Sequence, residues 1–557
     1  MSAPDRAPGG PWDELGDFTT TRRTILIAAI AVVIGVIAGY VALALLKLIA
    51  GFTNLFFFQT WRTSDASPVH HHLGWAVVLV PVVGGLLIGL LARFGSDKIR
   101  GHGIPEALES IMLRGSRVEP KVALLKPLSS AISIGSGGPF GAEGPIIMTG
   151  GAFGSMIAQA FRLTAAERKT LLVSGAAGGM AATFGTPIAA TLLAVELLLF
   201  EWKPRSFIPV ALACASAMAT RHFLFSPEPL FTVGQHAHEF GLPTLGAAAA
   251  CGIGAGMLAT AMTASVYAFE DLFQRLPIHW MWWPAIGGLV IGIGGLIEPR
   301  AMGVGYDSIS ALLQGHMALR AILVLVIVKW TIWAFSLGSG TSGGVLAPLL
   351  MIGGALGALE GHIFPYEGEG FWALISMGAI LGGTMRSPLT GILFAAEVTQ
   401  DFHALLPISI AVVVAHGFTV LFLKRSILTE KVVRRGYHIT REYAIDPLEV
   451  LFVRDVITLD TEPRPLPPHT KPVPAELRAH LDDTLRVATL RMAVANVTIL
   501  PIVDNDNNFL GEIALADVLK ARLRHLEEET RRERIIPVGR YLPIPKALIP
   551  PFIRERL

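Results

Sequence analysis

Charged residues are scarce in most of this chain. They make up 16% of its 557 residues, against roughly 25% in ordinary soluble domains. The deficit is local, because about 10% of residues 24–425 are charged and about 30% of residues 426–557. This scarcity excludes a soluble protein with one ordinary core, and it also excludes a disordered chain. We therefore predict a polytopic membrane protein with a soluble C-terminal domain.

Cysteine is also rare, and the formal net charge is close to zero. The two cysteines, Cys214 and Cys251, lie in apolar stretches, which excludes a disulfide scaffold and predicts two packed core thiols. The net charge of +2 is too small to hold nucleic acid by charge alone, so we expect no nucleic-acid partner.

Groupings of catalytic or metal-binding residues are missing as well. The sequence has no cluster with metal-ligand spacing and no nucleophile paired with a base, so we predict neither an enzyme nor a bound cofactor. The run His70-His71-His72 could ligate a metal, but we expect it to lie in a solvated external loop.

Long apolar runs are what the chain does have. The run at 24–46 has no charged residue and is long enough to span a bilayer. Many later runs are broken by glycine or proline, which membrane proteins tolerate where backbone lines a cavity or is buried in protein. We therefore predict an all-α fold of broken helices in the lipid bilayer. The later runs cover about 75–92, 168–200, 206–220, 243–268, 279–297, 319–337, 343–364 and 371–423.

The distribution of Lys and Arg predicts the orientation. Residues 1–23 form a polar segment without a signal peptide and end in two arginines. Segments 93–126 and 424–435 are rich in Lys and Arg, whereas 226–240 and 361–370 have none. By the positive-inside rule, both termini are cytoplasmic, and the protein is integral to the inner (plasma) membrane if it is bacterial.

Two pairs of segments show an internal repeat. The sequence PIIMTGGAFG at 145–154 matches PLLMIGGALG at 348–357, at an offset of 203. The segment 186–196 matches 387–397 at an offset of 201, and each copy ends in glutamate. Duplicated halves with helix breaks in matching places indicate a transporter-type core with its site at the repeat interface.

Three glycine-rich breaks precede apolar helices. They are GHGIPE at 101–106, GSGGPFGAEGP at 135–145 and GSGTSGGVLAP at 338–348. Glycine lets backbone approach a ligand closely, and proline fits the first helical turn. The free N–H groups of a helix start attract anions, so three converging starts predict a small-anion site without any fixed cation.

Two other interpretations of these glycines are open. Glycines that follow the breaks usually serve helix packing, which we expect for Gly150, Gly151, Gly353 and Gly354. A nucleotide loop is not supported, because no break has the Gly-Lys-Ser/Thr ending of a P-loop and none follows a predicted strand.

The three motifs resemble the signature of the CLC chloride channels, which include voltage-gated chloride channels, and of the chloride/proton exchangers in the same family. The resemblance covers residues 24–435. It implies a homodimer with one pore per subunit, and two inverted halves of tilted, broken helices in each subunit. We place these halves at about 24–225 and 243–435.

Glu143 is the leading candidate for function. It is a lone carboxylate in a glycine loop at predicted membrane depth, where an ionisable group is costly and functional by default. The alternative is a carboxylate that complements a helix dipole. By resemblance, Glu143 is the gate that swings out when protonated or displaced by the anion. The resemblance assigns anion binding to His102, Gly103, Ile104, Ala142, Gly144, Val345, Leu346 and Leu428.

The motifs also depart from the family pattern. His102 replaces the usual serine, Leu428 the usual tyrosine and Leu346 the usual phenylalanine. Ala142 stands where a basic residue is common. We expect His102 to donate N–H to the anion when neutral and to add a charge when protonated; the alternative is an imidazole bonded to a nearby loop carbonyl.

Proton coupling depends on one further position. The exchangers' internal proton-accepting glutamate falls at Leu197, directly after Glu196. We expect Glu196 and its repeat partner Glu397 to be structural. The leading hypothesis is passive transport of chloride or similar small anions. The alternatives are a chloride/proton exchanger that uses another acceptor such as Glu201, and a cation transporter regulated by the C-terminal domain.

The C-terminal part has an α/β pattern. Helices are predicted at 483–495 and 515–526, strands at 499–503 and 509–513, and a turn at 504–508. The segments LPIVD (500–504) and GEIALAD (511–517) resemble a CBS domain at about 450–530, followed by a tail at 531–557.

Asp517 matches the position that binds ribose in nucleotide-binding CBS domains. Ala514 replaces the usual Ser or Thr three residues earlier. Binding of an adenine nucleotide and a structural or dimer-packing role are both open, and we favour the second.

Overall fold

The computed structural model describes residues 20–436 except 114, 227, 237 and 238, together with 18, 448, 451–457, 478–504 and 508–530. The chain divides into two compact units, one at Phe18–Glu442 and one that contains the described residues from 448 onward. Most of the predicted N-terminal segment, the C-terminal tail at 531–557 and the middle of the predicted turn at 504–508 lie outside the described residues.

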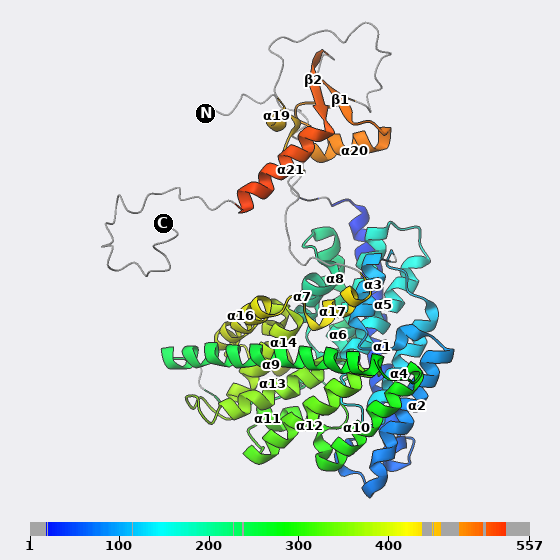
Figure 1. The fold of residues 1–557 in the computed structure, drawn as a ribbon, viewed down its shortest axis with the longest axis vertical. Coiled ribbons are helices and arrows are strands. Elements are labelled where there is room, and N and C mark those ends of the chain that lie inside the picture. Colours follow the sequence, from blue (N-terminus) through cyan, green and yellow to red (C-terminus); the bar gives the residue numbers. More distant parts are fainter. Residues whose placement is uncertain are drawn as a thin grey trace, which may run out of the picture. The chain divides into compact units, whose positions relative to one another are not determined.

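The unit at Phe18–Glu442, called the membrane unit below, is a bundle of helices of very unequal length (Figure 1). The first half contains α1 (Arg23–Phe58), α2 (Leu79–Phe94), α3 (Ile104–Leu113), α4 (Pro120–Gly135), α5 (Glu143–Gln159), α6 (Ala165–Phe184), α7 (Pro187–Leu193), the π-helical η5 (Ala194–Leu199) and α8 (Pro204–Leu224). The second half contains α9 (Leu242–Gln274), α10 (Trp283–Ile297), α11 (Tyr306–Leu313), α12 (Leu319–Gly338), α13 (Leu346–Glu360), α14 (Phe371–Met385), α15 (Pro388–Thr399) and α16 (Leu405–Phe422). After these comes α17 (Ile427–Arg434), and short 3₁₀ turns lie at η2 (Pro68–His70), η3 (Gly74–Val78), η4 (Asp97–Ile99), η6 (Trp280–Trp282) and η7 (Pro299–Ala301).

Seven helical stretches of the described residues are long and apolar enough to cross a membrane. They are Arg23–Phe58, Gly74–Phe94, Pro204–Leu224, Leu242–Gln274, Trp280–Ile297, Leu319–Gly338 and Leu405–Arg434. The remaining apolar helices are shorter, as the broken runs predict. The apolar run at 168–200, for example, is divided between two helices. Gly185, with a φ of 72°, caps the end of α6, and Pro187 is the first residue of α7.

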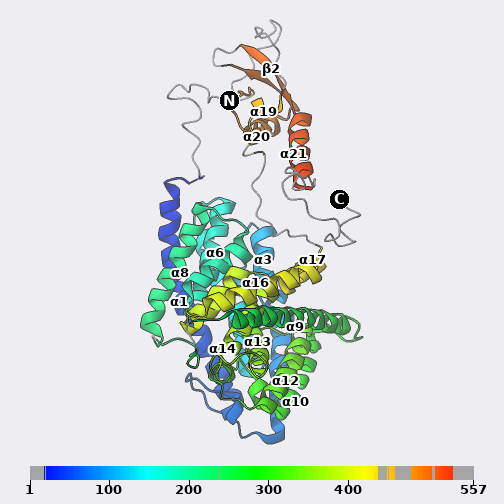
Figure 2. The ribbon, with the colours of Figure 1, turned by 90° about the vertical axis from the view of Figure 1, so that its left-hand side faces the viewer.

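The two halves have the same order of helices and the same neighbours. In the first half α1 packs on α8 and α5 on α6, and in the second half α9 packs on α16 and α13 on α14. Figure 2 shows the long helix α9 running beside α16. Across the halves, α2 packs on α10 and α7 on α15. The predicted fold class, an all-α membrane protein of inverted repeats with a small α/β region, is confirmed.

Two glutamates tie the halves together reciprocally. The Glu196 carboxylate accepts hydrogen bonds from the N–H groups of Leu389 and Thr390 at the start of α15, at 3.1 and 2.8 Å. The Glu397 carboxylate accepts from Ile188 and Ala189 at the start of α7, at 3.0 and 2.7 Å. Each carboxylate therefore caps a helix of the other half, as expected for structural residues.

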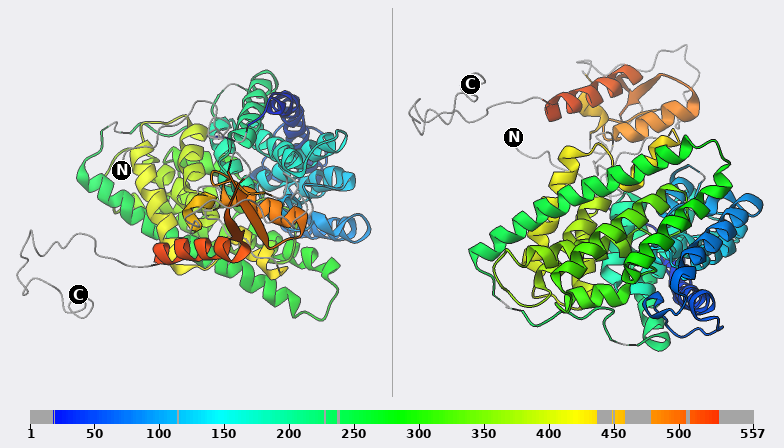
Figure 3. Two further views of the ribbon diagram at one scale, coloured as in Figure 1. Left: turned by 90° about the horizontal axis from the view of Figure 1, so that it is seen from above. Right: turned by 60° about the horizontal axis from the view of Figure 1, so that its bottom comes forward.

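The C-terminal unit is a two-stranded antiparallel sheet with helices. Strand β1 (Ile499–Val503) pairs with β2 (Phe509–Ala514), and the described helices are α19 (Val453–Val456), α20 (Leu485–Ala495) and α21 (Leu515–Thr530). Figure 3 shows the strands in orange with these helices around them. The predicted strands and helices are confirmed, with α20 beginning at Leu485 because the Thr484 hydroxyl caps it.

Candidate anion site

The three glycine-rich breaks meet and bond to one another. Gly141 and Gly344 form an antiparallel bridge, with N–H to carbonyl distances of 3.3 and 2.9 Å. The N–H of Gly101 lies 3.4 Å from the carbonyl oxygen of Gly340. A Cβ on Gly144 would stand 1.9 Å from the carbonyl oxygen of His102, so only glycine fits there. The predicted convergence of the motifs is thus present.

Three helices begin where the breaks meet. Ile104 opens α3, Glu143 opens α5 and Leu346 opens α13, and Pro105, Pro145 and Pro348 lie in their first turns. The residues predicted to bind the anion are all buried: His102, Gly103, Ile104, Ala142, Gly144, Val345, Leu346 and Leu428. The structure brings seven of them together at these helix starts, and it places Leu428 on the first turn of α17, which packs on α3.

Glu143 lies at the centre of this arrangement and is fully buried. Its Oε1 accepts a hydrogen bond from the N–H of Ala347 at 3.0 Å, so the carboxylate occupies the free end of α13. Its Oε2 is buried and has no hydrogen-bond partner among the described residues. A carboxylate therefore sits where an anion would be attracted by a helix start.

Two buried lysines were missed by the sequence analysis. Lys126 donates to the carbonyl oxygens of Ile99 and Gly101 at 2.9 and 2.7 Å. Lys329, the equivalent residue of the second half, donates to those of Ala301 and Gly303 at 3.0 and 2.9 Å. Both side chains are fully buried. Two cations that the expectation of a site without any fixed cation did not include are therefore bonded to backbone beside the first glycine break and before α11.

A signal for these lysines was present in the sequence. They occur at an offset of 203, the offset of the internal repeat, each in a run that carries few other charges. A lone lysine that recurs at the period of a repeat indicates a shared structural role. Their partners could not be read from the sequence, because each carbonyl lies more than 20 residues before the lysine.

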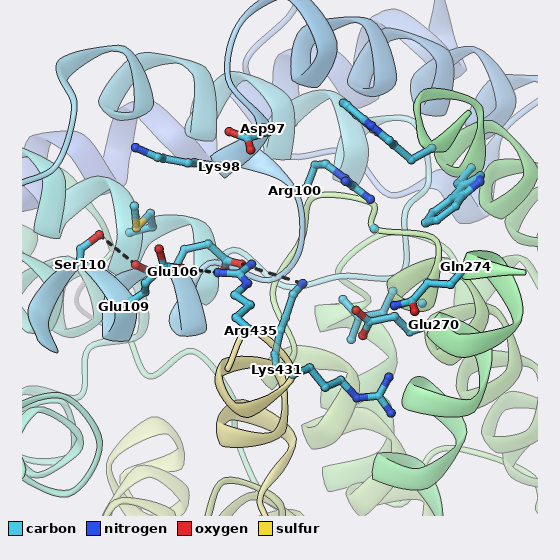
Figure 4. Close-up of a pocket in the computed structure, with 17 residues that line it drawn as sticks. Asp97, Lys98, Arg100, Glu106, Glu109, Ser110, Glu270, Gln274, Lys431 and Arg435 are labelled. Carbon is cyan, nitrogen blue, oxygen red and sulfur yellow. Dashed lines mark hydrogen bonds and ion pairs between the residues drawn. The ribbon is translucent and has the colours of Figure 1, made fainter. Parts of the chain in front are cut away.

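A charged cavity of about 550 Å³ opens beside the first glycine loop. Figure 4 shows Lys431 and Arg435 reaching from the α17 end of the chain toward Glu106 on α3. The Arg435–Glu106 distance is 2.8 Å and the Lys431–Glu106 distance is 3.9 Å. Burial alone would raise the pKa of Glu106, but the neighbouring cations, with Lys431 and Arg435 the strongest, lower it to about 2. Glu106 is therefore ionised, and its Oε2 also accepts the N–H of Gly103 at 2.9 Å.

Arg100 lines the same cavity. Its guanidinium lies 4.4 Å from the centre of the Trp280 ring, within cation–π distance. The same guanidinium lies 5.9 Å from the centre of the Trp283 ring. The lining carries five cationic and four acidic side chains, and Lys431 and Arg435 are paired with Glu106, so the charges of the cavity largely compensate one another.

His102 is buried next to that cavity. Its Nδ1 has no hydrogen-bond partner among the described residues. Three positive charges act on the ring, those of Lys431, Lys126 and Arg435, against the one negative charge of Glu106. Burial, and after it the charge of Lys431, lower the pKa of His102 to about 3, which favours the neutral imidazole over the titrating one that we expected.

Leu428 leaves the pathway without a side-chain donor at its position. A tyrosine does stand next to it, because the Tyr267 hydroxyl of α9 donates to the carbonyl oxygen of Ile427. That proton is committed to the backbone, so Tyr267 does not replace the missing hydroxyl as a donor. The sequence analysis missed this residue because it belongs to a distant helix.

The two carboxylates near the predicted proton-coupling position have other partners. Leu197 is buried in η5, and Glu196 beside it caps α15. Glu201 lies 3.8 Å from Arg205 in a partly exposed ion pair. The described residues contain no group of three or more His, Cys, Asp or Glu side chains that could hold a metal ion.

Comparison with known proteins identifies the family of this chain. A family described as voltage gated chloride channel matches residues 83–420. The chain belongs to this family, known as CLC. It is 31% identical over 408 residues to the H(+)/Cl(-) exchange transporters ClcA of Salmonella arizonae and Salmonella newport, which covers 70% of this chain and 84% of each relative.

Solved CLC structures share the fold. A slow cyanobacterial Cl⁻/H⁺ antiporter matches with a TM-score of 0.66 and 22% identity, covering 75% of this chain and 99% of the other. A CLC-type fluoride/proton antiporter matches with a TM-score of 0.62 and 22% identity, covering 74% and 98%. The family resemblance inferred from the three glycine motifs is therefore confirmed, whereas these comparisons do not show a CBS domain.

Proposed function

We propose that this protein moves chloride or a similar small anion across a membrane, with Glu143 as the gate. The observation that carries the proposal is the Glu143 carboxylate on the N–H of Ala347, at a helix start that suits an anion. A negative group that occupies an anion site must leave before an anion passes, and protonation or a competing anion would release it. Cations beside the first loop support the choice of an anion.

Reconstitution tests this proposal directly. Chloride efflux from proteoliposomes is measured with valinomycin and potassium present, so that charge movement is compensated. We expect efflux well above that of protein-free vesicles, and loss of efflux when impermeant organic anions replace chloride. Efflux no faster than in protein-free vesicles, with chloride and with fluoride, would refute the proposal.

We further propose that the transport is passive. Leu197 cannot carry a proton, and Glu196 is held by two backbone N–H groups of α15. The second candidate is chloride/proton exchange, favoured by the names of the relatives, with Glu201 as the acceptor. A chloride gradient imposed on proteoliposomes while internal pH is followed separates the two. Sustained uphill proton movement would overturn passive transport, and its loss in Glu201→Gln would assign the acceptor.

The remaining expectations concern the assembly. We propose a homodimer, both termini in the cytoplasm, and a CBS-like role for the C-terminal unit. Within that unit, the Asp517 Oδ2 accepts the N–H of Ala514 at 3.0 Å, which supports a structural role over ribose binding. Light scattering in detergent tests the dimer, and calorimetry with an adenine nucleotide tests the C-terminal unit.

A cation transporter is disfavoured, because helix starts and lysines surround the breaks.

A further inference from the structure

Among the buried polar atoms without a hydrogen-bond partner in the described residues, two belong to residues whose helices contact α13. One is Oε2 of Glu143 and the other is the hydroxyl oxygen of Tyr306, the first residue of α11. Buried polar atoms are rarely left unpaired, because each unpaired group loses its hydrogen bonds to water and gains none in the protein. Because α5 and α11 both contact α13, these two atoms point to a second arrangement in which they pair.

Contacts with α13 place these two residues close together. Glu143 is bonded to the N–H of Ala347, and Met351 follows one turn later on the same face of the helix. The methyl group of Met351 packs against Gly305, where an added Cβ would stand only 2.0 Å from it. Tyr306 follows Gly305 directly, so Tyr306 at the start of α11 and the Glu143 carboxylate at the start of α5 both adjoin α13.

Lys329 gives a second, independent link. Its ammonium group donates to the carbonyl of Gly303, three residues before Tyr306. The charge of the same lysine acts on Glu143. The loop at 303–305 and the Glu143 carboxylate therefore share Lys329 as a neighbouring cation.

The groups that face Tyr306 leave Glu143 as the partner. The charged groups that act on its hydroxyl are Glu143 and Arg221. Arg221 is already bonded to the carbonyl oxygens of Ala182 and Thr183, at 2.6 and 3.0 Å. The Tyr306 ring packs edge-on against Phe231, with ring centres 5.7 Å apart, which offers no hydrogen bond to the hydroxyl. Of these groups, only Glu143 has a buried atom without a partner.

We propose that the Tyr306 hydroxyl is the hydrogen-bond partner of Glu143 when that side chain leaves Ala347. A phenol both donates and accepts, so it can accept the proton of a neutral carboxylic acid or donate to its carbonyl oxygen. The proton stays on the carboxyl group, and Tyr306 acts as a positioning residue. This inference rests on the proposed gating by Glu143 and adds the place to which the gate moves.

The equivalent position of the first half is Ile104, which has no hydroxyl. The Gly-Val-Gly-Tyr segment at 303–306 and the Gly-His-Gly-Ile segment at 101–104 otherwise match in backbone, with all four glycines at positive φ. The hydroxyl is therefore a property of one side of the repeat, as expected if it serves Glu143, which is also present in one half only.

The test is a double-mutant cycle in proteoliposomes. Chloride efflux is measured against external pH for the wild type, Tyr306→Phe, Glu143→Gln and the double variant. Tyr366→Phe is the matched control, since this tyrosine is 82% exposed. Thermal unfolding in detergent verifies that Tyr306→Phe, which loses a single oxygen, is folded.

We expect Tyr306→Phe to move the midpoint of activation to lower pH by about half to one unit, because the protonated, displaced gate loses one hydrogen bond. In the Glu143→Gln background the same change should alter neither the pH profile nor the rate by more than about twofold. Tyr366→Phe should behave as the wild type.

Two results would overturn the inference alone. One is a midpoint within about 0.2 pH units of the wild type in Tyr306→Phe while Glu143→Gln abolishes the pH dependence. The other is an equal effect of Tyr306→Phe with and without Glu143. Full pH dependence in Glu143→Gln would instead refute gating by Glu143, and the inference would fall with it.

Discussion

In the first half of the membrane unit, Lys126 holds two carbonyl oxygens before α3, and in the second half Lys329 holds the two equivalent ones before α11. Glu196 and Glu397 repeat in the same way, each capping a helix of the other half. These four side chains maintain broken helices within an apolar region, where unpaired backbone groups are costly. The framework is therefore duplicated.

The chemistry that we assign to transport is not duplicated. Glu143 of the first half corresponds to Leu346 of the second, and Glu106 corresponds to Ser308. Glu106 ties the first glycine loop to α17, whereas Ser308 Oγ makes a long bond of 3.4 Å to the carbonyl of Arg300. The comparison indicates that the lysines and glutamates shared by both halves stabilise the fold, whereas Glu143, the gate that we propose, is present in one half only.

The largest effect should come from removing a shared lysine. Lys126→Met removes a hydrogen-bond donor from two backbone carbonyls and from the Ser342 hydroxyl, and Lys329→Met removes one from two carbonyls. We expect each variant to lose about 3–5 kcal/mol of stability. Thermal unfolding in detergent measures this, with exposed Lys121→Met as the control. A wild-type unfolding temperature in either variant would show that this lysine does not stabilise the fold, and that the two lysines are not equivalent.

A smaller loss is expected for Glu106→Gln, which affects one half only. The pKa of Glu106 falls from 4.5 to about 2 in the folded protein because Lys431 and Arg435 outweigh the effect of burial. The difference corresponds to about 3 kcal/mol, which is present above pH of about 4.5 and is lost as the pH falls toward 2.

The pH dependence of unfolding tests this assignment. The wild type should lose stability between pH 4.5 and about 2, and Glu106→Gln should lack that component of the loss. Ser308→Ala, at the equivalent position, is the control and should leave the profile unchanged. Identical profiles for the wild type and Glu106→Gln would show that the ion pairs with α17 contribute nothing.

The smallest effect should come from the reciprocal caps. Glu196→Ala and Glu397→Ala each remove a carboxylate from two backbone N–H groups, at a cost of about 1–2 kcal/mol. Under the passive transport that we propose, the ratio of protons to chloride is zero in the wild type, and both variants should keep it there in flux assays. A selective change of that ratio in Glu196→Ala would give Glu196 a role in proton transfer and would contradict its structural assignment.

Much of this comparison could be predicted from the sequence, since the repeat, the glycine breaks and Glu143 are local patterns. The helix starts at Ile104, Glu143 and Leu346 follow from glycine and proline at fixed places. The contacts of Lys126, Tyr267 and Tyr306 could not be predicted, because each depends on a segment brought close only by the fold. The cost of a charge at His102 likewise depends on Lys431, more than 300 residues away.

The central claim is that Glu143, present in one half only, is the gate. The most direct test is the initial rate of chloride efflux from proteoliposomes as a function of external pH, for the wild type and Glu143→Gln. Glu196→Gln serves as the control, since it changes another partly buried carboxylate of the same half. We predict that the wild-type rate rises as the pH falls, that Glu143→Gln is fast and nearly independent of pH, and that the control follows the wild type. A pH response in Glu143→Gln equal to that of the wild type would contradict the account.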